Sequence, residues 1–112
     1  MLFGLLAGTL DVLILRALAD GPNHGYGIAR WVSIATDTEL TVEDGALYTA
    51  LHRLEKRGLL RASWRRSDTN RRAKYYTLTP KGRRVLAEQT KIWHRSAAAL
   101  FKALGRAPKG IS

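Results

Sequence analysis

The sequence predicts a mainly α (α+β) fold in which three short helices precede two strands and one long final helix. Apolar residues recur at helical spacing in three segments before residue 58, alternate at strand spacing over residues 60–79, and return to helical spacing afterwards. A chain of 112 residues is expected to form one domain with at most one appended element. Each element follows from its own local pattern.

The first two helices are predicted over residues 8–19 and 25–36. GTLDVLILRALA is apolar nearly all round, which is typical of a buried helix, and the turn-forming cluster DGPNHG ends it. The second helix repeats apolar residues such as Ile28 and Val32 at helical spacing. We expect both helices to contribute to the core.

The third helix is predicted over residues 43–57, with Gly58 as the residue that ends it. Leu47, Leu51 and Leu54 lie within a narrow stripe when the residues are placed at helical spacing. The residues on the opposite side are Gly45, Thr49, His52, Arg53 and Lys56. This polar face is either a solvated surface or a surface that docks in a DNA major groove.

A β-hairpin is predicted from two alternating segments, residues 60–65 and 73–79, joined by the polar turn RRSDTNRR. Its cations are Arg65, Arg66, Arg71, Arg72 and Lys74. Like charges this close repel one another unless an anion is bound, so we interpret the hairpin as a phosphate-binding wing rather than a loop kept soluble by charge. Three short helices followed by such a hairpin is the order of a winged helix-turn-helix.

The positive charge begins abruptly in the third helix. The net charge is +10, yet residues 1–50 carry two basic and six acidic residues, while residues 51–80 carry nine basic and two acidic ones. Residues 81–112 add eight basic residues against one acidic residue. This asymmetry indicates a surface directed at a polyanion.

The last helix is predicted over residues 80–104, with Thr79 as its N-cap and Pro80 at its first position. Its apolar stripe either packs on the first helix of the same chain or forms a two-fold dimer, which we favour. The expected dimer contacts are Leu86, Ile92, Trp93, Leu100 and Leu104. The predicted organisation is a DNA-binding domain over residues 5–79, a dimerisation helix over 80–105 and a flexible tail over 106–112.

Several classes of protein are not expected. The chain has no cysteine, so disulfides and thiolate metal sites are excluded. The apolar N-terminal segment lacks a basic start and is interrupted by Asp11 and Arg16, so we predict neither a signal peptide nor a membrane span and expect a cytoplasmic protein. Its three histidines fall on separate segments, so no enzyme, metal or cofactor is predicted.

Four segments together resemble the PadR family of bacterial transcriptional repressors: GTLDVLIL, HGYGIA, GALYTALHRLEKRGLL and NRRAKYYTLTPKGRRVL. Trp64 also falls where that family usually has a tryptophan, and the resemblance spans roughly residues 5–104. It implies a winged helix that binds operator DNA as a homodimer through its C-terminal helix. The chain is similar to the short branch, which has one such helix.

The resemblance implies that the hydroxyls of Tyr26 and Tyr48 donate to phosphates, although interior packing is an equal alternative. We expect His52 and Arg53 to contact or approach base edges, and His24 to close a turn. Two positions depart from the family pattern: Ala46 replaces a usual serine or threonine, and Thr49 replaces a usual proline. The operator sequence therefore cannot be taken from a relative.

The predicted function is a sequence-specific DNA-binding regulator, expected to be a repressor that binds double-stranded operator DNA as a homodimer. The alternative is a basic protein that binds nucleic acids such as RNA without sequence preference. Trp31, Trp93 and Phe101 are candidates for a small-molecule effector pocket at the dimer interface, but aromatic residues at helical spacing are more often core residues.

Overall fold

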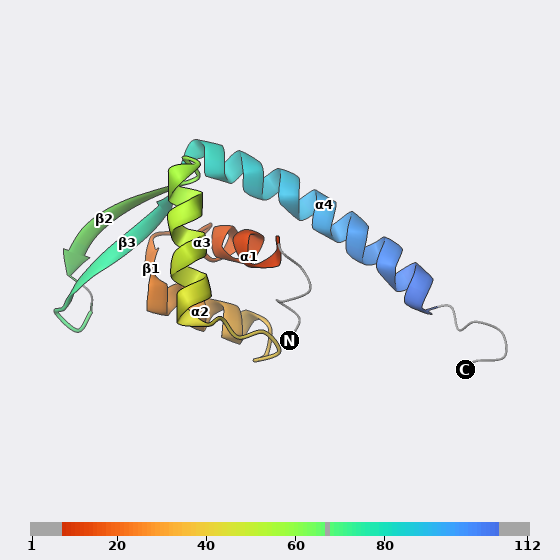
Figure 1. The fold of residues 1–112 in the computed structure, drawn as a ribbon, viewed down its shortest axis with the longest axis horizontal. Helices are drawn as coiled ribbons and strands as arrows, with labels where there is room; N and C mark the ends of the chain where they lie inside the picture. Colours follow the sequence, from red (N-terminus) through yellow and green to blue (C-terminus); the bar gives the residue numbers. More distant parts are fainter. Residues whose placement is uncertain (1–7, 67, 106–112) are drawn as a thin grey trace.

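The computed structural model describes residues 8–66 and 68–105, and its elements follow the predicted order with one addition (Figure 1). They are α1 (Thr9–Ala17), β1 (Asn23–His24), α2 (Gly25–Ala35), α3 (Asp44–Lys56), β2 (Leu60–Arg66), β3 (Arg72–Leu78) and α4 (Pro80–Gly105). Helices α1 to α3 cluster together, while the β2–β3 wing and the far end of α4 extend from that cluster in opposite directions. The predicted mainly α fold with a wing is confirmed.

The core lies where α1, α2, α3 and the base of the sheet meet. The largest fully buried side chains are Ile14, Leu15, Leu18, Ile28, Val32, Leu47, Leu51, Leu54 and Leu59. All three leucines of the predicted α3 stripe are in this set, so one face of α3 is fixed by the core. Truncating any of them to alanine would typically cost about 2–5 kcal/mol.

The end of α3 has the predicted glycine cap. Gly58 adopts a φ of 77°, a left-handed conformation that favours glycine. Its N–H donates to the Glu55 carbonyl at 2.9 Å, and the Leu59 N–H donates to the Leu54 carbonyl at 3.0 Å. These two bonds form a Schellman motif, which reverses the chain and buries Leu59.

The sheet has the strand order β1-β3-β2, and both pairings are antiparallel. The short strand β1 was not predicted, because two residues are too few to show alternation; it pairs Asn23 with Tyr76 and His24 with Tyr75. Leu60 and Leu78 face each other at the buried base of the hairpin, whereas Trp64 further along β2 is 58% exposed. The wing therefore projects beyond the core.

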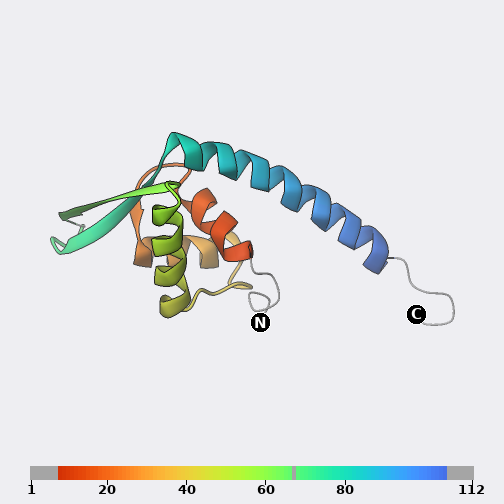
Figure 2. The same cartoon turned by 45° about the horizontal axis from the view of Figure 1, so that its top comes forward.

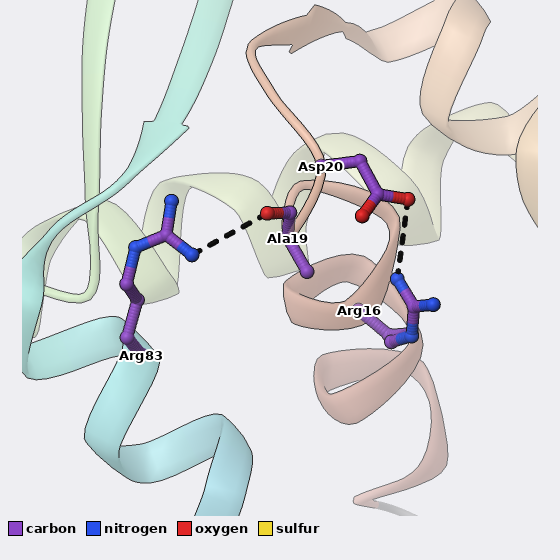
Figure 3. A network of polar contacts seen from close by, with 4 residues as sticks. All are labelled: Arg16, Ala19, Asp20 and Arg83. Carbon is purple, nitrogen blue, oxygen red and sulfur yellow. Dashed lines mark hydrogen bonds and ion pairs between the residues drawn. The ribbon is translucent and has the colours of Figure 1, made fainter.

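The first turns of α4 are attached to the rest of the domain. The Arg83 guanidinium donates to the Ala19 carbonyl just after α1 at 3.3 Å, close to the Arg16–Asp20 ion pair (Figure 3). Val85 and Leu86 pack against the core. Beyond them α4 extends away from the helical cluster in both views (Figure 2), and Ile92, Leu100 and Leu104 are exposed. Helix α4 packs on α1, with Trp93 beside Gly8, while the choice between this fold-back and a dimer stays a prediction.

No helix within the described residues is both long enough and apolar enough to cross a membrane.

Candidate nucleic-acid interface

The polar face of α3 is exposed as the sequence predicts. Thr49, His52 and Lys56 point away from the buried leucines, and no hydrogen bond or ion pair among the described residues engages their side chains. Gly45 lies on the same face one turn before Thr49, where it leaves the surface open. This face therefore presents a hydroxyl, an imidazole and an ammonium group to an external partner.

Arg53 lies at the edge of this face. Its guanidinium forms an ion pair with the carboxylate of Asp11 on α1, and both side chains are only partly exposed. Contact with a base edge would require Arg53 to exchange this carboxylate for DNA. The predicted base contact by Arg53 remains a prediction, and the centre of the free face is formed by Thr49, His52 and Lys56.

Two tyrosines flank the start of α2. Tyr26 and Tyr48 are 72% and 53% exposed, so their rings are not packed in the interior. The Tyr48 hydroxyl lies so close to Gly25 that a Cβ there would be 2.7 Å from it. Glycine at position 25 therefore allows the Tyr48 ring to rest across the beginning of α2. Both residues therefore present more than half of their surface to an external partner.

His24 closes the turn before α2, as expected. It is the N-cap residue, and its Nδ1 accepts a hydrogen bond from the Gly27 N–H at 3.0 Å. Its ring also meets the edge of Tyr75 at 5.1 Å between centroids. This histidine positions α2 against the sheet, and its Nδ1 is already used.

The cations of the wing differ in how they are held. Arg65 stacks on Tyr75 at 4.1 Å and Arg72 lies over Trp64 at 5.4 Å, measured from the guanidinium carbon to the ring centroid. Cation–π contacts of this kind orient the guanidinium while leaving its charge available. Arg66 donates to the Asn70 carbonyl at 3.2 Å, across the turn where Asn70 has a φ of 61°.

Lys74 links the wing to α3. Its ammonium lies 3.6 Å from the Glu55 carboxylate on α3, which holds β3 near that helix. On the same strand Tyr76 is buried and Tyr75 is partly exposed, in keeping with their alternation. Burial raises the pKa of the Tyr76 phenol above its usual 10.0, and the nearby Lys74 charge opposes that rise.

The three aromatic residues predicted for an effector pocket lie on separate parts of the described chain. Trp31 on α2 lies beneath Arg16, Trp93 lies beside Gly8, and Phe101 is 75% exposed on the far half of α4. The small cavity beside α1 is lined by other residues. An effector pocket from these residues would thus need a second chain, and it stays a prediction.

The described residues contain no group of three or more histidine, cysteine or acidic side chains that could hold a metal ion.

A core-mounted helix with a free polar face, beside a basic β-hairpin, defines the winged helix-turn-helix class of DNA-binding proteins. Within that class, the model of the transcriptional regulator PadR-like family matches residues 14–88. The chain belongs to this family, whose members are DNA-binding regulators of transcription and not enzymes. The predicted family and the predicted absence of an enzymatic role are thereby confirmed.

Solved structures and a curated protein show the same relationship. A transcriptional regulator from Clostridium thermocellum is 29% identical, with a TM-score of 0.78 over 88% of this chain and 96% of that one. A PadR family regulator from Eggerthella lenta is 34% identical, with a TM-score of 0.74 over 93% and 88% of the two chains. A Lysinibacillus sphaericus protein called uncharacterized protein X is 30% identical over 80% of this chain and 82% of its own length.

Proposed function

We propose that the protein is a repressor that binds a pseudo-palindromic operator as a homodimer and recognises its sequence through α3. The free polar face of α3 carries this proposal, since three fully buried leucines hold the opposite face rigidly in the core. A solvated face would suffice for solubility, but the basic wing lies directly beside it. A polar helix face and a basic wing side by side can contact a base-pair groove and the flanking phosphates of duplex DNA together.

In this proposal α3 enters the major groove and the wing follows the flanking backbone. Thr49 and His52 would face base edges, where a hydroxyl and an imidazole can each donate or accept a hydrogen bond. Lys56, Arg65, Arg66, Arg71 and Arg72 would contact phosphates. Phosphate contacts set the register of the protein on DNA, while base contacts give its sequence preference.

The dimer would form through the far half of α4. Leu100 and Leu104 lie one turn apart and both are exposed, as is Ile92 two turns earlier. Trp93 adds a partly buried ring on the same stripe, whereas Leu86 already packs on its own core and would contribute less. A two-fold dimer would place two copies of α3 about 34 Å apart, one turn of DNA.

A small-molecule effector is a further part of the proposal. A ligand held between two chains by Trp31, Trp93 and Phe101 would change the spacing of the two α3 helices and so release the operator. Because the target is chromosomal DNA, the proposed location is the cytoplasm.

Selection of bound sequences from a pool of random duplexes tests the repressor proposal. We expect enrichment of two inverted half-sites separated by about one helical turn. His52→Ala should relax the preference at specific positions, whereas Arg71→Ala should weaken binding to all duplexes alike. Equal affinity for unrelated duplexes and for RNA at the same salt concentration would instead support the non-specific alternative.

A further inference from the structure

An open groove separates the helical part of the DNA-binding face from the wing. Its volume is about 1180 Å³, and its walls come from α2 and α3 on one side and from β2, β3 and their connecting turn on the other. The cations along it are Arg30, Arg71, Arg72 and Lys74, and the acids are Glu55 and Asp68. Since Glu55 pairs with Lys74, three arginines face the single remaining acid.

Arg30 is the unexpected member of this set. It lies in the half of the sequence that carries net negative charge, on the exposed side of α2, one turn after Tyr26. No ion pair or hydrogen bond to its side chain is present within residues 8–66 and 68–105. Arg53 and Lys74, in contrast, each have a carboxylate partner. An unpaired guanidinium across a groove from two further arginines favours an anion between them.

The opposite wall offers an apolar surface among its charges. The Trp64 ring lines the groove more than halfway exposed, with the Arg72 guanidinium above it. One face of the hairpin carries Trp64, Lys74 and Tyr76. Trp64 and Lys74 are cross-strand partners, and Tyr76 lies two residues after Lys74 on the same strand, so its side chain is on the same face. On such a wall the cations can bind phosphates while the aromatic ring packs on a sugar, which fits a strand in which sugars and phosphates alternate.

We propose that this groove seats one sugar–phosphate strand of the bound duplex, with Arg30 donating to a phosphate from the α2 wall. Trp64 packs against deoxyribose from the wing wall, and Tyr26 donates to the same strand as Arg30. This inference rests on the proposed use of α3 as the reading helix. It adds Arg30 to Tyr26 as a second contact from α2, beside those of α3 and the wing.

Arg30→Ala provides the test, and Arg95→Ala on the exposed polar side of α4 provides a matched control. Dissociation constants are measured over a salt series for the selected duplex and for an unrelated duplex. Each lost phosphate contact lowers the magnitude of the slope of log K against log salt by about 0.9. A homodimer carries Arg30 twice, so we expect Arg30→Ala to lower the magnitude of the slope by about 1.8, with an equal fold-loss on both duplexes, and Arg95→Ala to leave it unchanged. A wild-type slope in Arg30→Ala would overturn the inference.

Trp64→Ala separates sugar packing from base stacking. Packing on the backbone predicts weaker binding to both duplexes with an unchanged salt slope. Tighter wild-type binding to single strands than to duplex, lost in Trp64→Ala, would mean that the groove takes bases and would overturn the inference. If the wild type shows no preference between the two duplexes, the repressor proposal fails, but the salt slope of Arg30→Ala can still be measured. If the wild type prefers the selected duplex and Arg30→Ala keeps the wild-type salt slope, only the assignment of the groove fails.

Discussion

The two halves of α4 differ in how far their apolar side chains are buried. At its start, Gly82 is buried, Thr79 caps the helix, and Arg83 and Val85 reach the rest of the domain. Towards its end, Leu100, Phe101 and Leu104 are exposed on a helix that extends away from α1, α2 and α3. The start of α4 therefore packs on the rest of the chain, whereas its end leaves apolar side chains exposed.

The difference shows that apolar residues on one continuous stripe can have different energetic roles. Burial of the early residues contributes to the stability of the single chain, whereas exposure of the later ones leaves about 25 cal/mol per Å² of apolar area to be gained on association. Substitutions in the first half should change folding, and those in the second half should change assembly. The following predictions test that division.

The largest effect is expected from Gly82→Ala. A Cβ at this position would lie 2.2 Å from the Leu59 carbonyl oxygen and 3.0 Å from Leu78 Cδ2, so the start of α4 would have to move off the β2–β3 base. We expect a loss of about 3 kcal/mol in the free energy of unfolding, measured with urea at fixed protein concentration. Gly105→Ala at the other end of α4 has open space around it and should leave stability nearly unchanged. Equal losses in both variants would remove the distinction between the two halves.

The next effect concerns assembly. Leu100→Ala should weaken self-association by about 2 kcal/mol, a nearly 30-fold increase in the dissociation constant, because the proposed dimer buries this exposed side chain. Lys102→Ala, on the opposite side of the same helix turn, is the control and should associate like the wild type. Equilibrium sedimentation gives the dissociation constants of the wild type and the two variants. A wild type that is monomeric at micromolar concentration would contradict the dimer itself.

Loss of the α4 cap should have a smaller effect. The Thr79 hydroxyl accepts from the Gly82 N–H at 3.0 Å and donates to the Gly58 carbonyl at 2.7 Å, so it joins the cap of α4 to the end of α3. Thr79→Ala should lower the free energy of unfolding by about 1–2 kcal/mol in urea titrations. Thr79→Ser keeps the hydroxyl and should recover most of that loss; a serine variant as unstable as the alanine variant would show that the methyl group matters more.

Local patterns predicted most of this architecture. The leucine stripe of α3, the glycine after it and the Thr79–Pro80 start of α4 each depend on neighbours within about one helical turn, and all three occur in the structure. Their physical causes are short-range, so they lie within a few residues along the chain.

Tertiary placement accounts for what the sequence could not show. Strand β1 exists because the turn before α2 happens to lie along Tyr75 and Tyr76. The Asp11–Arg53 pair depends on how α1 crosses α3, and Arg30 enters the groove only because α2 faces the wing. Because the first 50 residues have a net negative charge, the charge distribution does not indicate Arg30 as a DNA contact. Its position one helical turn after Tyr26 does indicate it.

The smallest predicted effect is a pH dependence at the base of the wing. Because burial raises the pKa of Tyr76 above 10.0 in the folded state, the neutral phenol is favoured there and the unfolded chain ionises first. The contribution of Tyr76 to stability is therefore complete below pH 10 and is lost as pH rises through the folded-state pKa. Tyr76→Phe cannot ionise, so the difference in unfolding free energy between wild type and variant should be constant from pH 7 to about 9 and then shift in favour of the variant. A difference that stays constant to pH 11 would mean that the phenol reaches solvent, and that the boundary between the buried base and the exposed wing lies closer to Leu78.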